Sequence, residues 1–71
     1  MLKVKDNINL KELEKFGFIY LKCELYHLFI DEYNYIIVYD YSRELNFVCL
    51  NNERTKNKIF DLIQAGLVEK V

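Results

Sequence analysis

The side chains best suited to chemistry in this sequence are one histidine and two cysteines. His27 follows Glu24 and Tyr26, and Cys23 and Cys49 each lie inside an apolar run. A histidine acts as a general base only when a nucleophile or an orienting carboxylate lies within hydrogen-bonding reach. Glu24 is the one such group that the sequence places near His27. We therefore expect a structural or surface histidine and a protein that is not an enzyme.

The sequence does not have the residue spacings that metal or cofactor binding requires. Cys23, His27 and Cys49 are too few ligands for a zinc site and follow no zinc-binding pattern. The sequence has no glycine-rich phosphate loop and no Cys-x-x-Cys pair. We expect no metal and no cofactor. Two cysteines in apolar runs favour reduced thiols over the disulfide framework of a small secreted domain, so we expect an intracellular, cytoplasmic protein.

Tyrosines are the better candidates for a binding role. Tyrosine presents a large, rigid contact area with a polar tip and is enriched at interfaces. It is also a good strand former that tolerates a half-exposed surface, and this explanation needs no partner. The candidate binding residues are Tyr20, Tyr26, His27, Tyr35, Tyr39 and Arg43.

A predicted three-stranded meander must position these side chains. Residues 18–26 alternate with period two, which predicts a half-buried strand that breaks around His27 as a bulge or a strand end. Residues 31–34 are the candidate turn. Further strands are expected over residues 35–40 and 43–50.

The register between the last two strands decides which side chains share a face. Pairing Asp40 with Arg43 sets opposite charges across from each other and buries Leu45 and Phe47. A loop one residue longer would reverse the faces of the third strand. The preferred register puts one set of residues under the helices: Ile19, Leu21, Cys23, Ile36, Val38, Leu45 and Phe47. The opposite face then holds Tyr20, Tyr26, Tyr35, Ile37 and Tyr39, with Lys22, Glu24, Asn46 and Val48 among them.

Two helices are expected to cover the apolar face. Asn9 as N-cap with Glu12 three residues later predicts a helix start, and Gly17 predicts its end in a left-handed conformation. A second helix is expected over residues 53–65, with Gly66 ending it in the same way. Its predicted apolar side consists of Ile59, Phe60, Leu62 and Ile63.

Short strands are predicted at both termini, over residues 2–5 and 67–71, where they could pair. The element order is then β-α-β-β-β-α-β. This order predicts one small α+β domain over residues 1–71, with two layers: an antiparallel meander of three strands with short terminal strands, flanked by two helices.

The charge balance argues against some classes of partner. The 71 residues carry 10 Lys and Arg against 11 Asp and Glu, with no basic stripe, so nucleic-acid binding is not expected. No run approaches the roughly 20 apolar residues that span a bilayer, so no membrane association is expected.

The two ends of the chain carry a resemblance. Residues 4–18 read VKDNINLKELEKFGF and residues 61–71 read DLIQAGLVEKV. With these segments the chain resembles small uncharacterised proteins of phages and prophages in low-GC Gram-positive bacteria. The shared residues are packing motifs, so no functional residue is carried over. The resemblance implies an accessory protein that binds a host component, and some such proteins counter bacterial defence systems.

The primary hypothesis is a non-enzymatic, homo-oligomeric binding protein that inhibits a host factor through its tyrosine-rich sheet face. The alternative is an oligomeric sponge that sequesters a small nucleotide signal, with tyrosine rings stacking on bases and Arg43 or a lysine reaching phosphate. The second alternative is a small DNA-associated regulator.

Overall fold

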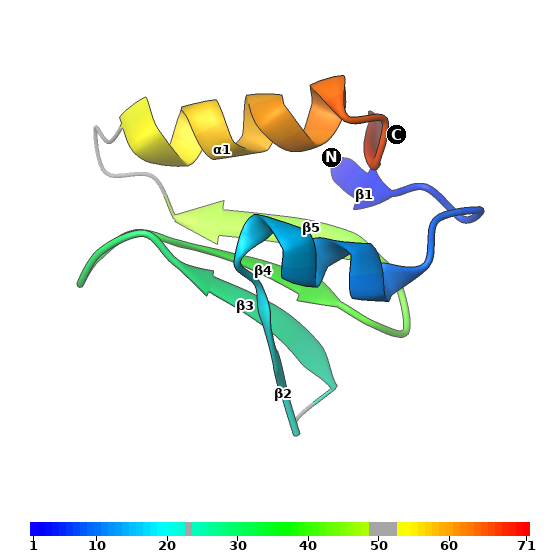
Figure 1. Cartoon of the computed structure of the whole chain (residues 1–71), viewed down its shortest axis with the longest axis horizontal. Helices are drawn as coiled ribbons and strands as arrows, with labels where there is room; N and C mark the ends of the chain where they lie inside the picture. The colour runs from blue at the N-terminus through cyan, green and yellow to red at the C-terminus, as the bar shows by residue number, and fades with distance from the viewer. Residues whose placement is uncertain (23, 49–52) are drawn as a thin grey trace.

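In the computed structural model, which describes residues 1–22, 24–48 and 53–71, two helices lie on the same side of one antiparallel sheet (Figure 1). The fold class is therefore the predicted two-layer α+β arrangement. The elements in chain order are β1 (Leu2–Val4), the 3-10 helix η1 (Leu10–Phe16), β2 (Ile19–Leu21), β3 (Leu25–Phe29), β4 (Tyr35–Tyr39), β5 (Glu44–Val48), α1 (Glu53–Gln64) and β6 (Val68–Lys70).

The sheet has six strands in the order β2-β3-β4-β5-β1-β6. β2, β3, β4 and β5 form an antiparallel meander with one strand more than expected, and β1 enters between β5 and β6. The two ends of the chain lie side by side, since the main-chain N–H of Val71 donates to the carbonyl of Met1 at 2.9 Å (Figure 1). The predicted pairing of the terminal strands is confirmed.

The single strand predicted over residues 18–26 is wrong, because the chain reverses between Leu21 and Leu25. β2 and β3 form a hairpin in which Tyr20 lies opposite Tyr26. Glu24 closes the turn with φ at 66° and donates its N–H to the carbonyl of Leu21 at 3.1 Å. A turn with no glycine or asparagine has none of the sequence features that mark hairpins, so the alternation alone indicated one strand.

The predicted ends of the first helix are confirmed. The Asn9 side chain accepts from the N–H of Lys11 at 3.0 Å. Gly17 takes φ of 95°, and the N–H of Phe18 returns to the carbonyl of Leu13 at 3.3 Å. This is the Schellman ending that satisfies the last carbonyls of a helix. The segment is a 3-10 helix, and Gly66 ends α1 with the same kind of bond, from Leu67 to Leu62 at 3.1 Å.

The preferred register of β4 and β5 is confirmed, with Val38 opposite Leu45 and Ile36 opposite Phe47. Leu45 is buried as expected, whereas Phe47, which was also expected to be buried, is 47% exposed. The turn between these strands is closed by Arg43, whose N–H donates to the carbonyl of Tyr39 at 2.8 Å. Arg43 has φ of 63°, the left-handed conformation that ends such hairpin loops.

The core lies between the sheet and the two helices. Leu13 of η1 and Leu62 of α1 are fully buried against Ile36 and Val38 of the central strand. The remaining buried apolar residues are Val4, Phe18, Tyr26, Leu28, Leu45, Ile59, Leu67 and Val68.

The apolar side predicted for the second helix is correct only in part. Ile59 and Leu62 are buried, and Thr55 completes their stripe, whereas Phe60 and Ile63 are 62% and 42% exposed. Phe60 and Ile63 instead border a partly open apolar pocket together with Phe47 of β5.

Candidate interaction surface

The sheet face turned away from the helices carries a connected set of apolar and aromatic side chains. Tyr26 and Leu28 of β3 are buried under the helices, so the alternate residues of that strand point the other way. The pairing of β2, β3 and β4 aligns these residues in rows across three strands. We call the following set the open face: Ile19, Leu21, Leu25, His27, Phe29, Tyr35, Ile37 and Tyr39.

His27 lies at the centre of the open face, between Ile19 of β2 and Ile37 of β4. Its ring packs against Phe29 at a centroid distance of 4.0 Å and meets Tyr35 edge-on at 5.4 Å. These neighbours shield its Nε2, which has no hydrogen-bond partner among the described residues. The surroundings of His27 are therefore suited to apolar packing, and its Nε2 is buried within the sheet face.

Several members of the open face are strongly exposed. Phe29 is 66% exposed, Ile19 is 60% exposed and Leu21 is 36% exposed. Tyr41, in the turn after β4, is 77% exposed and extends the surface through a ring contact with Tyr39 at 5.8 Å. Soluble proteins rarely leave a contiguous apolar patch uncovered unless something binds it.

The expectation that Tyr20 and Tyr26 lie on the same face as Tyr35 and Tyr39 is wrong. Tyr26 is only 7% exposed and stacks with Tyr20 at 4.9 Å on the helix side of the sheet. Burial raises the pKa of the Tyr26 hydroxyl. These two tyrosines therefore contribute to the covered side of the sheet.

A hydrogen bond fixes the exposed end of this tyrosine pair. The hydroxyl of Tyr20 donates to the carboxylate of Asp40 at 3.0 Å, which raises the pKa of Tyr20 because the bond holds its proton.

Ile19 and Leu21, which were expected under the helices, lie on the open face, because they alternate with Tyr20 along β2. Cys23, placed with them by the alternation, is outside the described residues.

Arg43 does not belong to the open face. Its Nη1 donates to the carbonyls of Lys5 and Ile8 at 2.8 and 2.6 Å, in a partly buried position. The guanidinium thereby fastens the loop before η1 to the turn between β4 and β5. The sequence analysis proposed Arg43 as a phosphate ligand, because the carbonyls of Lys5 and Ile8 come near it only in the folded chain.

Asp31 stabilises the turn between β3 and β4, next to Phe29 and Tyr35 of the open face. One carboxylate oxygen accepts from the N–H of Tyr33 at 2.9 Å and from the N–H and side chain of Asn34 at 3.0 and 2.8 Å. The other meets Arg54 of α1 at 3.4 Å. The bond from the Tyr33 N–H contributes most to lowering the pKa of Asp31.

Sequence reasoning missed Ile19, Leu21, Leu25 and Phe29 as surface residues. A usable signal was the spacing of Tyr26, Leu28 and Ile30, which share one face and would leave His27 and Phe29 on the other. Both sets are largely apolar, however, so patterning did not favour either one.

Within the described ranges no three His, Cys, Asp or Glu side chains gather as ligands. Cys49 falls outside those ranges. Neither described helix is long and apolar enough to cross a membrane.

Scans of this chain against models of protein families, against curated proteins and against solved structures found no match.

Proposed function

We propose that this chain is a non-enzymatic binding protein of phage or prophage type, which inhibits a host factor by covering part of it with the open face. A component of a bacterial defence system is the class of target that the resemblance at the two chain ends suggests. The free protein pairs its open face with a second copy until the host factor replaces that copy.

The observation that supports this proposal is the exposure of Phe29 and Ile19, at 66% and 60%, beside a shielded His27. Covering such side chains releases roughly 25 cal/mol for each Å² of apolar surface removed from water. The hydroxyls of Tyr35 and Tyr39 lie on the same face and can align a partner by hydrogen bonds. An apolar centre with a few polar groups is the usual composition of a protein interface.

A protein partner fits the open face better than a nucleotide does. Binding a small nucleotide needs a cation for phosphate, and the eight residues of the open face include no lysine and no arginine. Arg43, one of the cations that the nucleotide hypothesis names for phosphate, donates to the carbonyls of Lys5 and Ile8 instead.

Affinity capture from a lysate of a low-GC Gram-positive bacterium tests this function. We expect the wild-type protein to retain one host protein in stoichiometric amount, and Phe29→Glu to reduce its recovery at least about tenfold, because the carboxylate would be desolvated at the contact. Gln64→Glu, at an exposed position of α1, is the matched control and should retain the same protein.

Circular dichroism must first show that both variants are folded. Equal recovery of the host protein by Phe29→Glu and the wild type would contradict the proposal. Retention of a nucleotide in place of a protein would overturn it in favour of the sponge.

A further inference from the structure

His27 is the one side chain of the open face that belongs to a residue type titrating in mild acid. A histidine side chain in water takes up a proton at about pH 6.5, whereas tyrosine hydroxyls lose theirs only at about pH 10. The remaining members of the open face are apolar or tyrosine. Mild acid therefore changes the charge of the open face at a single point, and this point is its centre.

The two nitrogens of the His27 ring have different surroundings. Nε2 is buried without a hydrogen-bond partner among the described residues, whereas the side chain as a whole is half-buried, so water reaches the ring from its Nδ1 side. A neutral ring with its proton on Nδ1 presents only an acceptor at Nε2. The charged ring places an N–H donor there as well, and this donor finds no acceptor.

The strands beside His27 direct no charged group at it within the described part of the chain. Its neighbours across the sheet are Ile19 of β2 and Ile37 of β4. Phe29 and Tyr35 contact its ring. The other members of the open face are Leu21, Leu25 and Tyr39. An imidazolium at this position therefore depends on water for its stabilisation.

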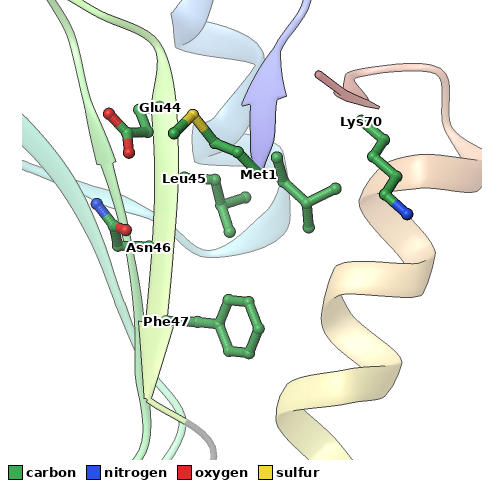
Figure 2. Close-up of a pocket in the computed structure, with 7 residues that line it drawn as sticks. Met1, Glu44, Leu45, Asn46, Phe47 and Lys70 are labelled. Atoms are coloured by element: carbon green, nitrogen blue, oxygen red, sulfur yellow. The ribbon is translucent and has the colours of Figure 1, made fainter.

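β5 brings one carboxylate to the same side of the sheet. Figure 2 shows Glu44 and Asn46 pointing to the side of β5 opposite to Phe47, which is directed toward α1. β4 lies between β5 and the strand of His27 in the sheet. Glu44 is therefore separated from His27 by a whole strand and does not pair with its ring.

The charged groups at the ends of the strands are directed elsewhere. Asp40 accepts from the hydroxyl of Tyr20 on the helix side of the sheet. Asp31 accepts from main-chain and side-chain groups of its own turn. Lys22 and Glu24 lie in the turn of the β2–β3 hairpin, beyond the paired residues of the two strands.

We propose that protonation of His27 releases the second copy from the open face, so that the protein pairs at neutral pH and separates in mild acid. This inference rests on the self-association that the proposed function includes. In the free protein, water reaches the charged ring from the open side, and a second copy removes that water. The free chain therefore binds protons more readily than the pair does, so pairing weakens as the pH falls.

The overall charge of the chain would produce the opposite trend. The net charge is −1 with His27 neutral, so one added proton brings it to zero. A smaller net charge reduces the repulsion between copies and promotes their association. Weaker association in mild acid would therefore reflect a charge placed at the contact between the copies.

Sedimentation equilibrium of the wild-type protein at about pH 7.5 and about pH 5.5, at equal ionic strength, tests the proposal. We expect the dissociation constant of the pair to be at least about tenfold higher at the lower pH, because both rings must lose a proton before the open faces meet.

Matched variants identify the group that takes up the proton. His27→Gln and His27→Leu carry no charge at either pH, so their dissociation constants should differ less than about twofold between the two conditions. Glu44→Gln removes the carboxylate that β5 directs to this side of the sheet and should retain the tenfold effect.

The outcomes separate this inference from the self-association on which it rests. Equal dissociation constants of the wild type at the two pH values would overturn the release by acid and leave the pairing of open faces intact. A wild type that is monomeric under both conditions would contradict the pairing itself, and the release with it. A pH effect that persists in both His27 variants would assign it to another group.

Circular dichroism of dilute wild-type protein should be the same at the two pH values. Loss of the folded spectrum in mild acid would also overturn the proposal, since the proton would then act on the fold of the single chain.

Discussion

Single glycines determine where both helices end. Gly17 and Gly66 have φ of 95° and 79°, a region that residues with a Cβ enter at a cost of about 1–2 kcal/mol. Their surroundings differ, because a Cβ on Gly17 would lie 3.2 Å from Cδ1 of the buried Leu28, whereas a Cβ on Gly66 would meet nothing within 4 Å. Gly17 thus serves both conformation and packing.

Alanine at the two glycines should therefore have unequal effects. We expect Gly66→Ala to lower the free energy of unfolding by about 1 kcal/mol through conformational strain alone. Gly17→Ala should lower it by roughly 2 kcal/mol or more, since Leu28 must also move. Urea denaturation measures both. Equal losses would mean that the contact with Leu28 relaxes freely.

At the scale of elements, two hairpin turns are closed by charged residues in a left-handed conformation. Glu24 has φ of 66° between β2 and β3, and Arg43 has φ of 63° between β4 and β5. Only Arg43 compensates for this strain with its side chain, through the carbonyls of Lys5 and Ile8. The two turns thus share a backbone conformation, but the side chain of Arg43 contributes hydrogen bonds to the stability of the fold.

Glycine at these two turns should give effects of opposite sign. Glu24→Gly removes the strain of the left-handed conformation but also increases the conformational entropy of the unfolded chain. The net effect should be a rise of about 0.5 kcal/mol in the free energy of unfolding. Arg43→Gly gives the same relief but removes two bonds from a charged donor, and should lower it by about 1–3 kcal/mol. Chemical denaturation distinguishes them, and a stabilising Arg43→Gly would show that those bonds contribute little.

At the scale of the whole molecule, both helices lie on one side of the sheet and leave the open face uncovered (Figure 1). A chain of 71 residues buries only about 60% of the surface of its unfolded state, so its stability margin is small. Pairing two open faces would add burial that neither copy provides alone.

We therefore expect the purified protein to self-associate through the open face. Sedimentation equilibrium should show a mass that rises from the monomer value of 8.6 kDa toward twice that value as concentration increases. Ile19→Glu should shift the equilibrium to the monomer, and Lys11→Glu on η1 should not. A wild-type protein that stays monomeric at every concentration, or an Ile19→Glu variant that associates normally, would contradict this expectation.

Local signals were sufficient for the helix ends and for one strand register. Asn9, Gly17 and Gly66 act within a few residues of their own positions, so their effect is readable without the fold. The pairing of Val38 with Leu45 followed from charge and burial across a short loop. Tyr35 and Tyr39 lie on the face away from the helices as predicted, because their strand was assigned correctly.

The sequence by itself determined the fold class, the helix ends and the register of β4 with β5, since each depends on neighbours along the chain. Only the tertiary structure decided that Tyr26 is covered and Ile19 exposed. Residues 25–30 are largely apolar on both alternations, so their faces depend on the turn at Glu24 and on pairing with β4. Likewise, Arg43 gained its role from carbonyls 38 and 35 residues away in the chain.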